Sequence, residues 1–359
     1  VRNIVNARIA ASLLPANRVT TIAEGLKGRK IMRLVQFRDR DGARRVGVPD
    51  SDIIRIVNGF ERVYDLARAA ARSDGLEALV STHLGDATEN YGATVADNRV
   101  LAPIDHPDPA HCLVSGTGLS HLGSAQARDK MHAKLTSGEN LTDSMKMFKA
   151  GLDGGKPAAG KIGADPEWFW KGDGSIVMPC GAALTSPSFA LDGGEEAEVA
   201  GIYLIGDDGT PLRLGFALAN EFADHVLERQ NYLLLAHSKL RHCAVGPELR
   251  LGPLPASVEG TTRIHRGNEI VWQGPFLSGE NNMSHSVANL EHHHFKYTLF
   301  RRPGDIHIHF LGAGSISFAD AVKTEEGDMF EIDVPEFGHP LSNSMTQEHG
   351  NAPVTVADI

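Results

Sequence analysis

A pair of glutamates two residues apart constrains this chain more than any other feature. Glu196 and Glu198 open an apolar run, Val199–Ile205, that is typical of a β-strand. Successive strand side chains alternate between the two faces of a sheet, so both carboxylates project to one side while Glu195 points away. Carboxylates held side by side repel each other, and a divalent cation such as Mg²⁺, Mn²⁺ or Ca²⁺ removes that cost. The alternative interpretation is an acidic edge strand in water.

A turn and a second strand follow the glutamate pair. Asp207-Asp208-Gly209 predicts a hairpin that would bring Leu214–Glu221 alongside the first strand. The return strand could then deliver Glu221 as a third oxygen ligand. Lys239 comes next, in a segment without an evident solvated run of charges. The predicted cation site has three carboxylate ligands, namely Glu196, Glu198 and Glu221.

The order of these motifs resembles the fumarylacetoacetate hydrolase superfamily. The shared order is a Glu-x-Glu pair, a strand that ends in Asn and an acidic residue, a Lys ahead of Gly-Pro, and several later turns. In this chain the later motifs are Gly246-Pro247, Arg302–Asp305, Glu326–Asp328, Phe337-Gly338 and Pro340–Asn343. The resemblance covers roughly residues 105–343, and it rests on the order and spacing of the motifs together.

The resemblance implies an α+β fold that is mainly β. Residues 105–343 would form a mixed β-roll like the C-terminal domain of fumarylacetoacetase, and residues 32–104 a small N-terminal α+β domain. The strand patterns agree with that class, because they outnumber helical ones after residue 160. We expect residues 1–31 to form a poorly ordered leader and residues 344–359, which show no period, a surface tail. Enzymes of this fold are usually homodimers or larger, and we expect the same here.

Local patterns predict several further elements. Met32–Phe37 and Arg44–Pro49 predict a hairpin, and Val63–Ala71 predicts a helix with one buried stripe. Pro103–Pro109 is rich in proline and predicts the boundary between the two domains. Asp143–Pro157 is polar and glycine-rich, which predicts a mobile lid or a surface excursion.

A segment rich in Gly, Ser and Thr is the predicted substrate loop. Gly116, Thr117 and Gly118 precede a helix predicted at Ser124–Lys134, where glycines let backbone amides approach a ligand and the helix N-terminus would face an anion. His121 lies on this loop. In hydrolases of the resembled superfamily a His is followed three residues later by a Glu, and the pair activates water, whereas Ser124 stands at that position here. His121 could instead hold the loop by hydrogen bonds to its backbone.

The resemblance assigns two lysines and a second glycine-containing segment to the site. Lys239 and Lys171 would act as charged partners of the substrate carboxylate or enolate, and not as Schiff-base nucleophiles, because nearby carboxylates raise the pKa of a lysine. From spacing alone Lys171 could be a turn lysine in solvent. The resembled enzymes hold the substrate carboxylate on a Thr-Gly-Thr-type loop, and the matching residues here are Gly312, Gly314 and Ser315.

Two histidine-rich stretches raise the question of a second metal. Asn282–Tyr297 predicts a helix, and the three consecutive residues His292–His294 cannot share one ion from one helix face, because adjacent residues point about 100° apart. His307 and His309 share a strand face that could bind Zn²⁺ or Cu²⁺. No third ligand is evident nearby, so we favour structural and hydrogen-bonding roles for both stretches.

The composition argues against several classes of protein. The chain has 359 residues and a net charge of -10, which argues against nucleic acid or an anionic membrane as the main partner. A small anionic substrate is compatible with this charge if a metal or local lysines offset it. The three cysteines are widely separated and favour neither a disulfide framework nor a thiolate metal site. No apolar run reaches transmembrane length, and we expect a cytoplasmic protein.

The predicted chemistry follows from three carboxylates and a cation. A 2-oxo acid chelates Mg²⁺ through its carboxylate and 2-keto oxygen, and the ion stabilises the enolate formed when a C3 proton leaves. A hydroxyl at C4 can then be expelled, which is dehydration. If C4 is a carbonyl, water can attack it and break the C3–C4 bond. Because the His/Glu pair that activates water is absent, the sequence favours dehydration.

A closer resemblance, to the AraD-like sugar-acid branch of the superfamily, names the reaction. Its segments are Gly116–Lys134, Pro166–Gly174, Asn220–His225, His237–Arg241 and His292–Tyr297. We therefore predict a Mg²⁺-dependent lyase that converts a 2-keto-3-deoxy sugar acid, such as 2-keto-3-deoxypentonate, into 2,5-dioxopentanoate. One alternative is a C–C hydrolase of acylpyruvates or diketo acids, which requires a Glu from elsewhere to pair with His121. The other is a metal-stabilised binding protein without turnover, which would be supported if Lys239 lay away from the metal.

Overall fold

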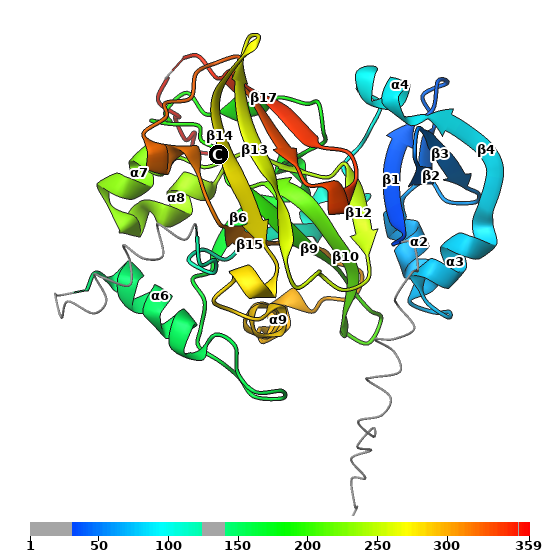
Figure 1. Cartoon of the computed structure of the whole chain (residues 1–359), viewed down its shortest axis with the longest axis horizontal. Coiled ribbons are helices and arrows are strands. Elements are labelled where there is room, and N and C mark those ends of the chain that lie inside the picture. The colour runs from blue at the N-terminus through cyan, green and yellow to red at the C-terminus, as the bar shows by residue number, and fades with distance from the viewer. Residues whose placement is uncertain (1–30, 124–140, 351) are drawn as a thin grey trace, which may run out of the picture. The chain divides into compact units, whose positions relative to one another are not determined.

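The computed structural model describes residues 31–123, 141–350 and 352–359 (Figure 1). Apart from Ile31, the predicted leader at residues 1–31 lies outside the described residues, and so does the helix predicted at Ser124–Lys134. The chain from Met32 onward forms one compact unit. Within the described ranges, none of the helices is long and apolar enough to cross a membrane.

A large mixed sheet organises the fold. Within the described residues it has twelve strands, and ten of them follow one another side by side. In spatial order these are β4 (Leu84–Asn90), β3 (Ile53–Val57), β2 (Arg44–Asp50), β1 (Arg33–Arg38), β12 (Glu248–Leu251), β10 (Pro211–Asn220), β9 (Ala197–Ile205), β15 (Ile306–Ala313), β5 (Cys112–Gly116) and β6 (Phe169–Asp173). The short strand β11 (Cys243–Val245) pairs with both β10 and β7 (Val177–Met178).

A second sheet, which is mixed, contains most of the strands of the C-terminal part of the chain. Its order is β14 (Glu269–Ser278), β13 (Val258–Arg266), β16 (Met329–Asp333), β17 (Leu341–Gln347) and β8 (Leu184–Ser186). The helices are α2 (Val63–Ala70), α3 (Leu76–His83), α4 (Tyr91–Ala96), α6 (Asp143–Gly154), α7 (His225–Gln230), α8 (Leu235–Lys239) and α9 (Val287–Phe295) (Figure 1). The fold is therefore α+β with strands predominating, as predicted.

The hairpin of β9 and β10 lies in the middle of the large sheet. Every residue of β9 is buried, because β10 pairs with one of its edges and β15 with the other. The register sets Ala219 opposite Glu198. The chain therefore leaves β10 beside the start of β9, where the amide of Glu221 donates to the carbonyl of Glu196 at 3.0 Å. The predicted hairpin is confirmed.

The side chains of β9 divide between separate apolar clusters. Ile202 and Leu204 pack in a cluster with α2 and the strands β1, β2, β10 and β15. Val199 packs in a second cluster with the smaller sheet, and Tyr203 in a third with Phe295. This burial on both faces explains why the β9 sequence is continuously apolar and does not alternate.

The N-terminal elements confirm two local predictions and correct one boundary. The hairpin of β1 and β2 and the helix α2 are present as predicted, and α2 buries one stripe of apolar residues. However, β1 pairs with β12, with Arg33 opposite Arg250. The large sheet is therefore continuous across the boundary predicted at residue 104, and residues 32–104 do not form a sheet of their own.

Two segments predicted to be irregular have regular structure. The predicted tail at 344–359 begins inside β17, which continues to Gln347. The residues of β17 alternate between buried and half-exposed, but the buried set includes Asn343, so hydropathy alone hides the period. The predicted lid at 143–157 is largely α6, whose first turn is capped by the side chain of Thr142.

The burial of the central strands predicts that loss of their apolar side chains destabilises the fold most. Ile308→Ala removes a fully buried side chain from β15, and we expect it to lower the free energy of unfolding by about 2–5 kcal/mol. Ile270→Ala on β14, where the side chain is 53% exposed, is the matched control. Urea unfolding followed by circular dichroism measures both. Equal losses for the two variants would contradict this account of the core.

Candidate active site

Three carboxylates meet at the junction of β9 and β10. Glu198 lies in β9, Glu196 directly precedes that strand, and Glu221 directly follows β10. One oxygen from each carboxylate lies within 4.8 Å of the other two, and no other His, Cys, Asp or Glu group of three in the described residues has this geometry. Glu195 points away, as predicted, because its carboxylate accepts hydrogen bonds from the amide and hydroxyl of Ser317 at 2.7 and 2.6 Å.

Lys239, the last residue of α8, places its ammonium group among these carboxylates. Its Nζ lies 2.5 Å from Glu196 Oε1 and 2.6 Å from Glu221 Oε2. Burial opposes the charge on Lys239, but the carboxylates of Glu196, Glu221 and Glu228 raise its pKa well above the usual value. An ammonium group is not a nucleophile, so this environment favours an electrostatic role over a Schiff base.

Lys171 on β6 lies behind the cluster and is committed to the protein. Its Nζ lies 2.6 Å from Glu221 Oε1 and donates to the carbonyls of Phe222 and Lys239, each at 2.9 Å. An ammonium group has three hydrogens, so these partners leave none for a substrate. Lys171 therefore orients Glu221, which corrects its predicted role as a partner of the substrate.

The three carboxylates differ in their ionisation. Burial, together with repulsion from Glu196 and Glu221, raises the pKa of Glu198 well above its usual value. Burial also opposes the charge on Glu196, but the charge of Lys239 and hydrogen bonds from His225 and Lys239 lower its pKa. The amide of Gly312 donates to Glu198 Oε2 at 2.6 Å and fixes that carboxylate in place. Full ionisation of the cluster thus requires more positive charge than Lys239 supplies.

His225 orients Glu196 and was not anticipated from the sequence. It begins α7, and its Nε2 lies 3.0 Å from Glu196 Oε1 while its Nδ1 lies 3.5 Å from Asp192 Oδ2. Burial opposes the charged ring, but hydrogen bonds to Asp192 and Glu196 raise the pKa of His225 to about 10. Its place four residues after Glu221, at the end of Asn-Glu-Phe-Ala-Asp-His, was the available indication.

A cavity of about 540 Å³ opens beside the carboxylate cluster. The segment after β5, the strand β6 with the residues before it, the helices α7 and α8, the strand β14 and residues 313–320 contribute its walls. Its lining residues are Gly118, Leu119, Glu167, Phe169, Glu196, His225, Glu228, Leu235, Lys239, Trp272, Pro275, Ala313, Gly314, Ser315, Ile316, Ala319 and Asp320. Glu196 and Lys239 thus present the cluster to the cavity.

Glu167 is the most informative residue that the sequence analysis missed. It lines the cavity and is buried, and its Oε1 has no hydrogen-bond partner among the described residues. Burial, followed by repulsion from Glu228, raises the pKa of Glu167 to about 7. A Cβ on Gly118 would come within 1.7 Å of Glu167 Oε2, so a larger residue at position 118 would displace the carboxyl. The glutamate directly before an aromatic strand was the only indication in the sequence.

His121 lies outside the cavity lining and has two hydroxyl partners. Its Nδ1 lies 3.1 Å from Ser120 Oγ, and its Nε2 lies 3.0 Å from Ser278 Oγ. Burial lowers the pKa of His121 to about 3, so the ring is neutral. We therefore revise the catalytic role predicted for His121 to a structural one, and Ser124 lies outside the described residues.

The two predicted substrate loops are only partly at the cavity. Gly118 lines it, but Gly116 is buried within β5 and the hydroxyl of Thr117 donates to the carbonyl of Phe310 at 3.2 Å. Gly314 and Ser315 line the cavity, whereas the amide of Gly312 binds Glu198. Gly116, Thr117 and Gly312 are therefore structural, because their polar groups are used within the protein or lie away from the cavity.

The histidine-rich stretches form a buried hydrogen-bonded group. His294 Nε2 lies 2.9 Å from His307 Nδ1, and Ser115 Oγ lies 2.9 Å from His309 Nδ1. The indole N–H of Trp168 donates to His294 Nδ1 at 3.2 Å. In the described part of the chain these histidines do not meet the geometry of a three-ligand metal group. The contacts agree with the hydrogen-bonding role favoured from the sequence.

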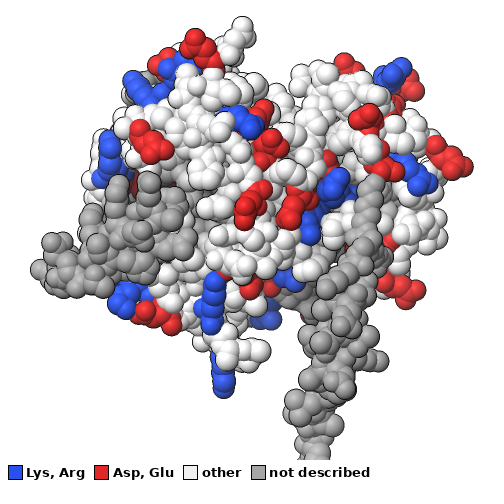
Figure 2. All heavy atoms as spheres, viewed as in Figure 1, with Lys and Arg blue, Asp and Glu red and all other residues white. Residues whose placement is uncertain are grey.

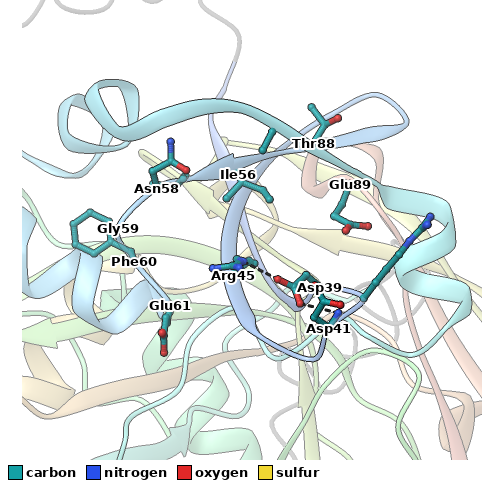
Figure 3. A pocket seen from close by; sticks show the side chains of 13 residues that line it. Asp39, Asp41, Arg45, Ile56, Asn58, Gly59, Phe60, Glu61, Thr88 and Glu89 are labelled. Carbon is teal, nitrogen blue, oxygen red and sulfur yellow. Dashed lines mark hydrogen bonds and ion pairs between the residues drawn. The ribbon is translucent and has the colours of Figure 1, made fainter.

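A larger hollow of about 800 Å³ lies near β2, β3 and β4, and two of its charged residues, Asp39 and Arg45, pair with each other (Figure 3). Arg45 Nε donates to Asp39 Oδ2 at 2.8 Å, and the other oxygen of Asp39 accepts from the amides of Asp41 and Ala43. On the face seen in Figure 2, acidic and basic side chains are interspersed over the surface. The smaller cavity, which holds the carboxylate cluster, is therefore the candidate active site.

The cluster fits a hard divalent cation. It offers three carboxylates with oxygens close enough to share one ion, which is the donor set that Mg²⁺ and Ca²⁺ prefer. The ammonium group of Lys239 already lies against two of them, which shows that the position attracts positive charge. The residues that could hold a metal are therefore those predicted, Glu196, Glu198 and Glu221.

Comparison with solved structures confirms the fold expected from the resemblance. A 2-keto-3-deoxyarabinonate dehydratase matches with a TM-score of 0.65 at 18% identity, over 89% of this chain and 100% of that one. A 2-keto-3-deoxy-D-arabinonate dehydratase complexed with magnesium and 2,5-dioxopentanoate matches with a TM-score of 0.64 at 19% identity, with the same coverage. A 2-hydroxyhepta-2,4-diene-1,7-dioate isomerase from Mycobacterium marinum gives 0.55 at 15% identity, over 89% and 100%.

The similar structures are enzymes of the fumarylacetoacetate hydrolase superfamily, and this chain has their fold. No family model and no curated protein matches the chain in sequence.

Removing one charge from the cluster should weaken metal binding. Glu198→Gln keeps the shape of the side chain but removes a charged ligand, and we expect it to lower the affinity for Mn²⁺ by about 100-fold or more. Glu195→Gln, three residues away and directed at Ser317, should leave the affinity unchanged. Isothermal titration calorimetry with MnCl₂ measures both variants. Unaltered affinity in Glu198→Gln would place the metal elsewhere.

Proposed function

We propose that this protein is a divalent-metal-dependent dehydratase that acts on a 2-keto-3-deoxy sugar acid. The observation that carries the proposal is a buried carboxyl group with a pKa of about 7, Glu167, in the cavity that also exposes Glu196 and Lys239 of the carboxylate cluster. A dehydratase needs a site that binds a 2-oxo acid and a group that moves one proton. The cavity offers candidates for both.

The similar structures support this class of reaction. Two of them are 2-keto-3-deoxyarabinonate dehydratases, and one of these was crystallised with magnesium and 2,5-dioxopentanoate. Identity of 18–19% supports a shared fold, and the substrate proposed here rests on the cavity. We infer a 2-keto-3-deoxypentonate as substrate and 2,5-dioxopentanoate as product.

The chain supplies the electrostatic part of the site. Glu196, Glu198 and Glu221 would hold a Mg²⁺ ion, which when bound supplies a Lewis acid for the oxygens of a 2-oxo acid. Lys239, held at 2.5 and 2.6 Å from two of these carboxylates, would add positive charge beside the enolate oxygen. Lys171 would keep Glu221 in position without reaching the substrate, and His225, which lines the cavity, would keep Glu196 in position.

Glu167 would carry the proton. As a carboxylate it can accept the proton that leaves C3, and as the resulting acid it can donate that proton to the departing C4 hydroxyl. The C3–H and C4–O bonds break, a C3–C4 double bond forms, and one water is released. The unsaturated product then loses a proton from C5 and gains one at C3, which gives the C4–C5 enol, and that enol gains a proton at C4 as its hydroxyl loses one to give the aldehyde of 2,5-dioxopentanoate. The net change is the loss of one water without oxidation.

The hydrolase alternative lacks its distinguishing pair among the described residues. It required a carboxylate beside His121, but both ring nitrogens of His121 face serine hydroxyls. The alternative of a binding protein without turnover would have been supported by a Lys239 remote from the cluster, and Lys239 instead contacts two of its members. The geometry therefore favours dehydration over both alternatives.

The product identifies the reaction. Purified protein with MgCl₂ and 2-keto-3-deoxypentonate should give a product 18 mass units lighter, with all five carbons retained, and EDTA should abolish its formation. A panel of acylpyruvates run in parallel tests for C–C cleavage. Pyruvate or another shorter acid among the products, or turnover that persists in EDTA, would contradict the proposal.

The pKa of Glu167 predicts a pH dependence at saturating Mg²⁺. The base form is required, so kcat/KM should fall with a slope of one proton as the pH drops through the pKa of Glu167, and a cation bound at the cluster lowers that pKa below about 7. Burial raises this pKa most, and the charges of Glu228, Lys239, Glu196 and Glu221 modify it further. Glu167→Gln should lower kcat by about 10²–10⁴-fold and remove the acid limb. If the Glu167→Gln variant still shows the fall in kcat/KM at low pH, another group transfers the proton.

A further inference from the structure

The charges on the cavity wall are strongly unequal. Four of its lining residues carry carboxyl groups, namely Glu167, Glu196, Glu228 and Asp320, whereas the cationic groups among the described lining residues belong to Lys239 and His225. One carboxyl, Glu167, is buried with an unpartnered oxygen, so the wall has an acceptor that a ligand can satisfy. The cavity wall around the carboxylate cluster is therefore lined with hydrogen-bond acceptors.

Both cationic groups are already committed to the cluster. Lys239 lies at hydrogen-bond distance from Glu196 and Glu221, and His225 bridges Glu196 and Asp192. A metal and Lys239 would balance one carboxylate at the 2-oxo acid end of a substrate. A second carboxylate at the far end would meet no uncommitted cation among the lining residues that the structure describes.

Glu228 is the acceptor best placed to bind the rest of the substrate. It projects from α7 with 28% of its side chain exposed, and its Oε2 lies 3.9 Å from Lys239 Nζ, beyond hydrogen-bond distance. Among the described residues, its carboxylate has this one charged neighbour and accepts no hydrogen bond. Its oxygens are therefore available to hydroxyl donors.

Asp320, held by Trp272, supplies a second acceptor on the cavity wall. The indole N–H of Trp272 donates to Asp320 Oδ2 at 2.9 Å, which holds the carboxylate in place and leaves its Oδ1 free of this bond. Asp320 and the flat ring of Trp272 both line the cavity. An oriented acceptor beside an aromatic face suits a chain of CH–OH groups, whose hydroxyls donate and whose C–H groups pack on the ring.

We propose that Glu228 and Asp320 determine specificity by accepting hydrogen bonds from the hydroxyl groups at the far end of the substrate and by repelling a second carboxylate. The site therefore selects monocarboxylic, hydroxylated 2-oxo acids over dicarboxylic ones. This inference rests on the proposed function for the orientation of the substrate, with its 2-oxo acid end at the carboxylate cluster. It adds the residues that distinguish one class of 2-oxo acid from another.

A matched pair of ligands tests the selectivity without turnover. 5-Hydroxy-2-oxopentanoate and 2-oxoglutarate have the same carbon chain and differ at C5, which is a hydroxymethyl group in one and a carboxylate in the other. Neither has a C4 hydroxyl, so neither can lose water by the proposed reaction. Isothermal titration calorimetry of the full chain with Mg²⁺, at fixed ionic strength, should show the hydroxy acid binding about tenfold or more tightly than 2-oxoglutarate.

Variants assign the selectivity to the two residues. Glu228→Gln and Asp320→Asn should each reduce the ratio of the two affinities, and Glu228→Lys should reverse it by favouring 2-oxoglutarate. Glu269→Gln, the same change on an exposed residue of β14, should leave the ratio as in the wild type. Wild-type protein that binds 2-oxoglutarate as tightly as the hydroxy acid, or a ratio that none of the three variants changes, would overturn the proposal.

These outcomes separate this inference from the proposed function. Selective binding without release of water from 2-keto-3-deoxypentonate would refute the dehydratase and leave the role of Glu228 and Asp320 intact. Release of water without selective binding would support the dehydratase and refute the role of Glu228 and Asp320 in specificity.

Discussion

The structure depends on three carboxylates buried together at one point of a sheet. Glu196, Glu198 and Glu221 repel one another in a setting that penalises each charge, and Lys239 and Lys171 offset only part of that cost. A buried charge without a partner costs several kcal/mol, so such a cluster adds little to the stability of the fold. The same arrangement could hold a divalent cation, whose charge would offset this repulsion.

The fold holds the three carboxylates in fixed positions relative to one another. The pairing of β9 with β10 fixes Glu198 opposite Ala219, and the next turn of the chain supplies Glu221. Pairing with β15 brings the Gly312 amide to Glu198, so the two neighbours of β9 each position a ligand. The apolar clusters on both sides of β9 make these positions rigid, and the acceptors of the cavity lie on the surrounding strands, helices and loops.

The sequence predicted what depends on local pattern and order. The Glu-x-Glu pair, its hairpin and Glu221 could be found because strand alternation and a two-strand turn are short-range rules. Lys171 was assigned to the substrate because of the family resemblance, which does not reveal that Glu221 and two carbonyls use its hydrogens. Glu167 was missed because its character depends on burial and on repulsion from Glu228, a residue sixty-one positions away. Such properties arise only from tertiary packing.

The central claim is that the three carboxylates bind one divalent ion, which adds its charge to that of Lys239 beside them. An anomalous difference map from a crystal soaked in MnCl₂ tests it most directly. The account predicts one strong peak at coordination distance from oxygens of Glu196, Glu198 and Glu221. A peak at another position, or an unoccupied cluster at saturating Mn²⁺, would contradict it.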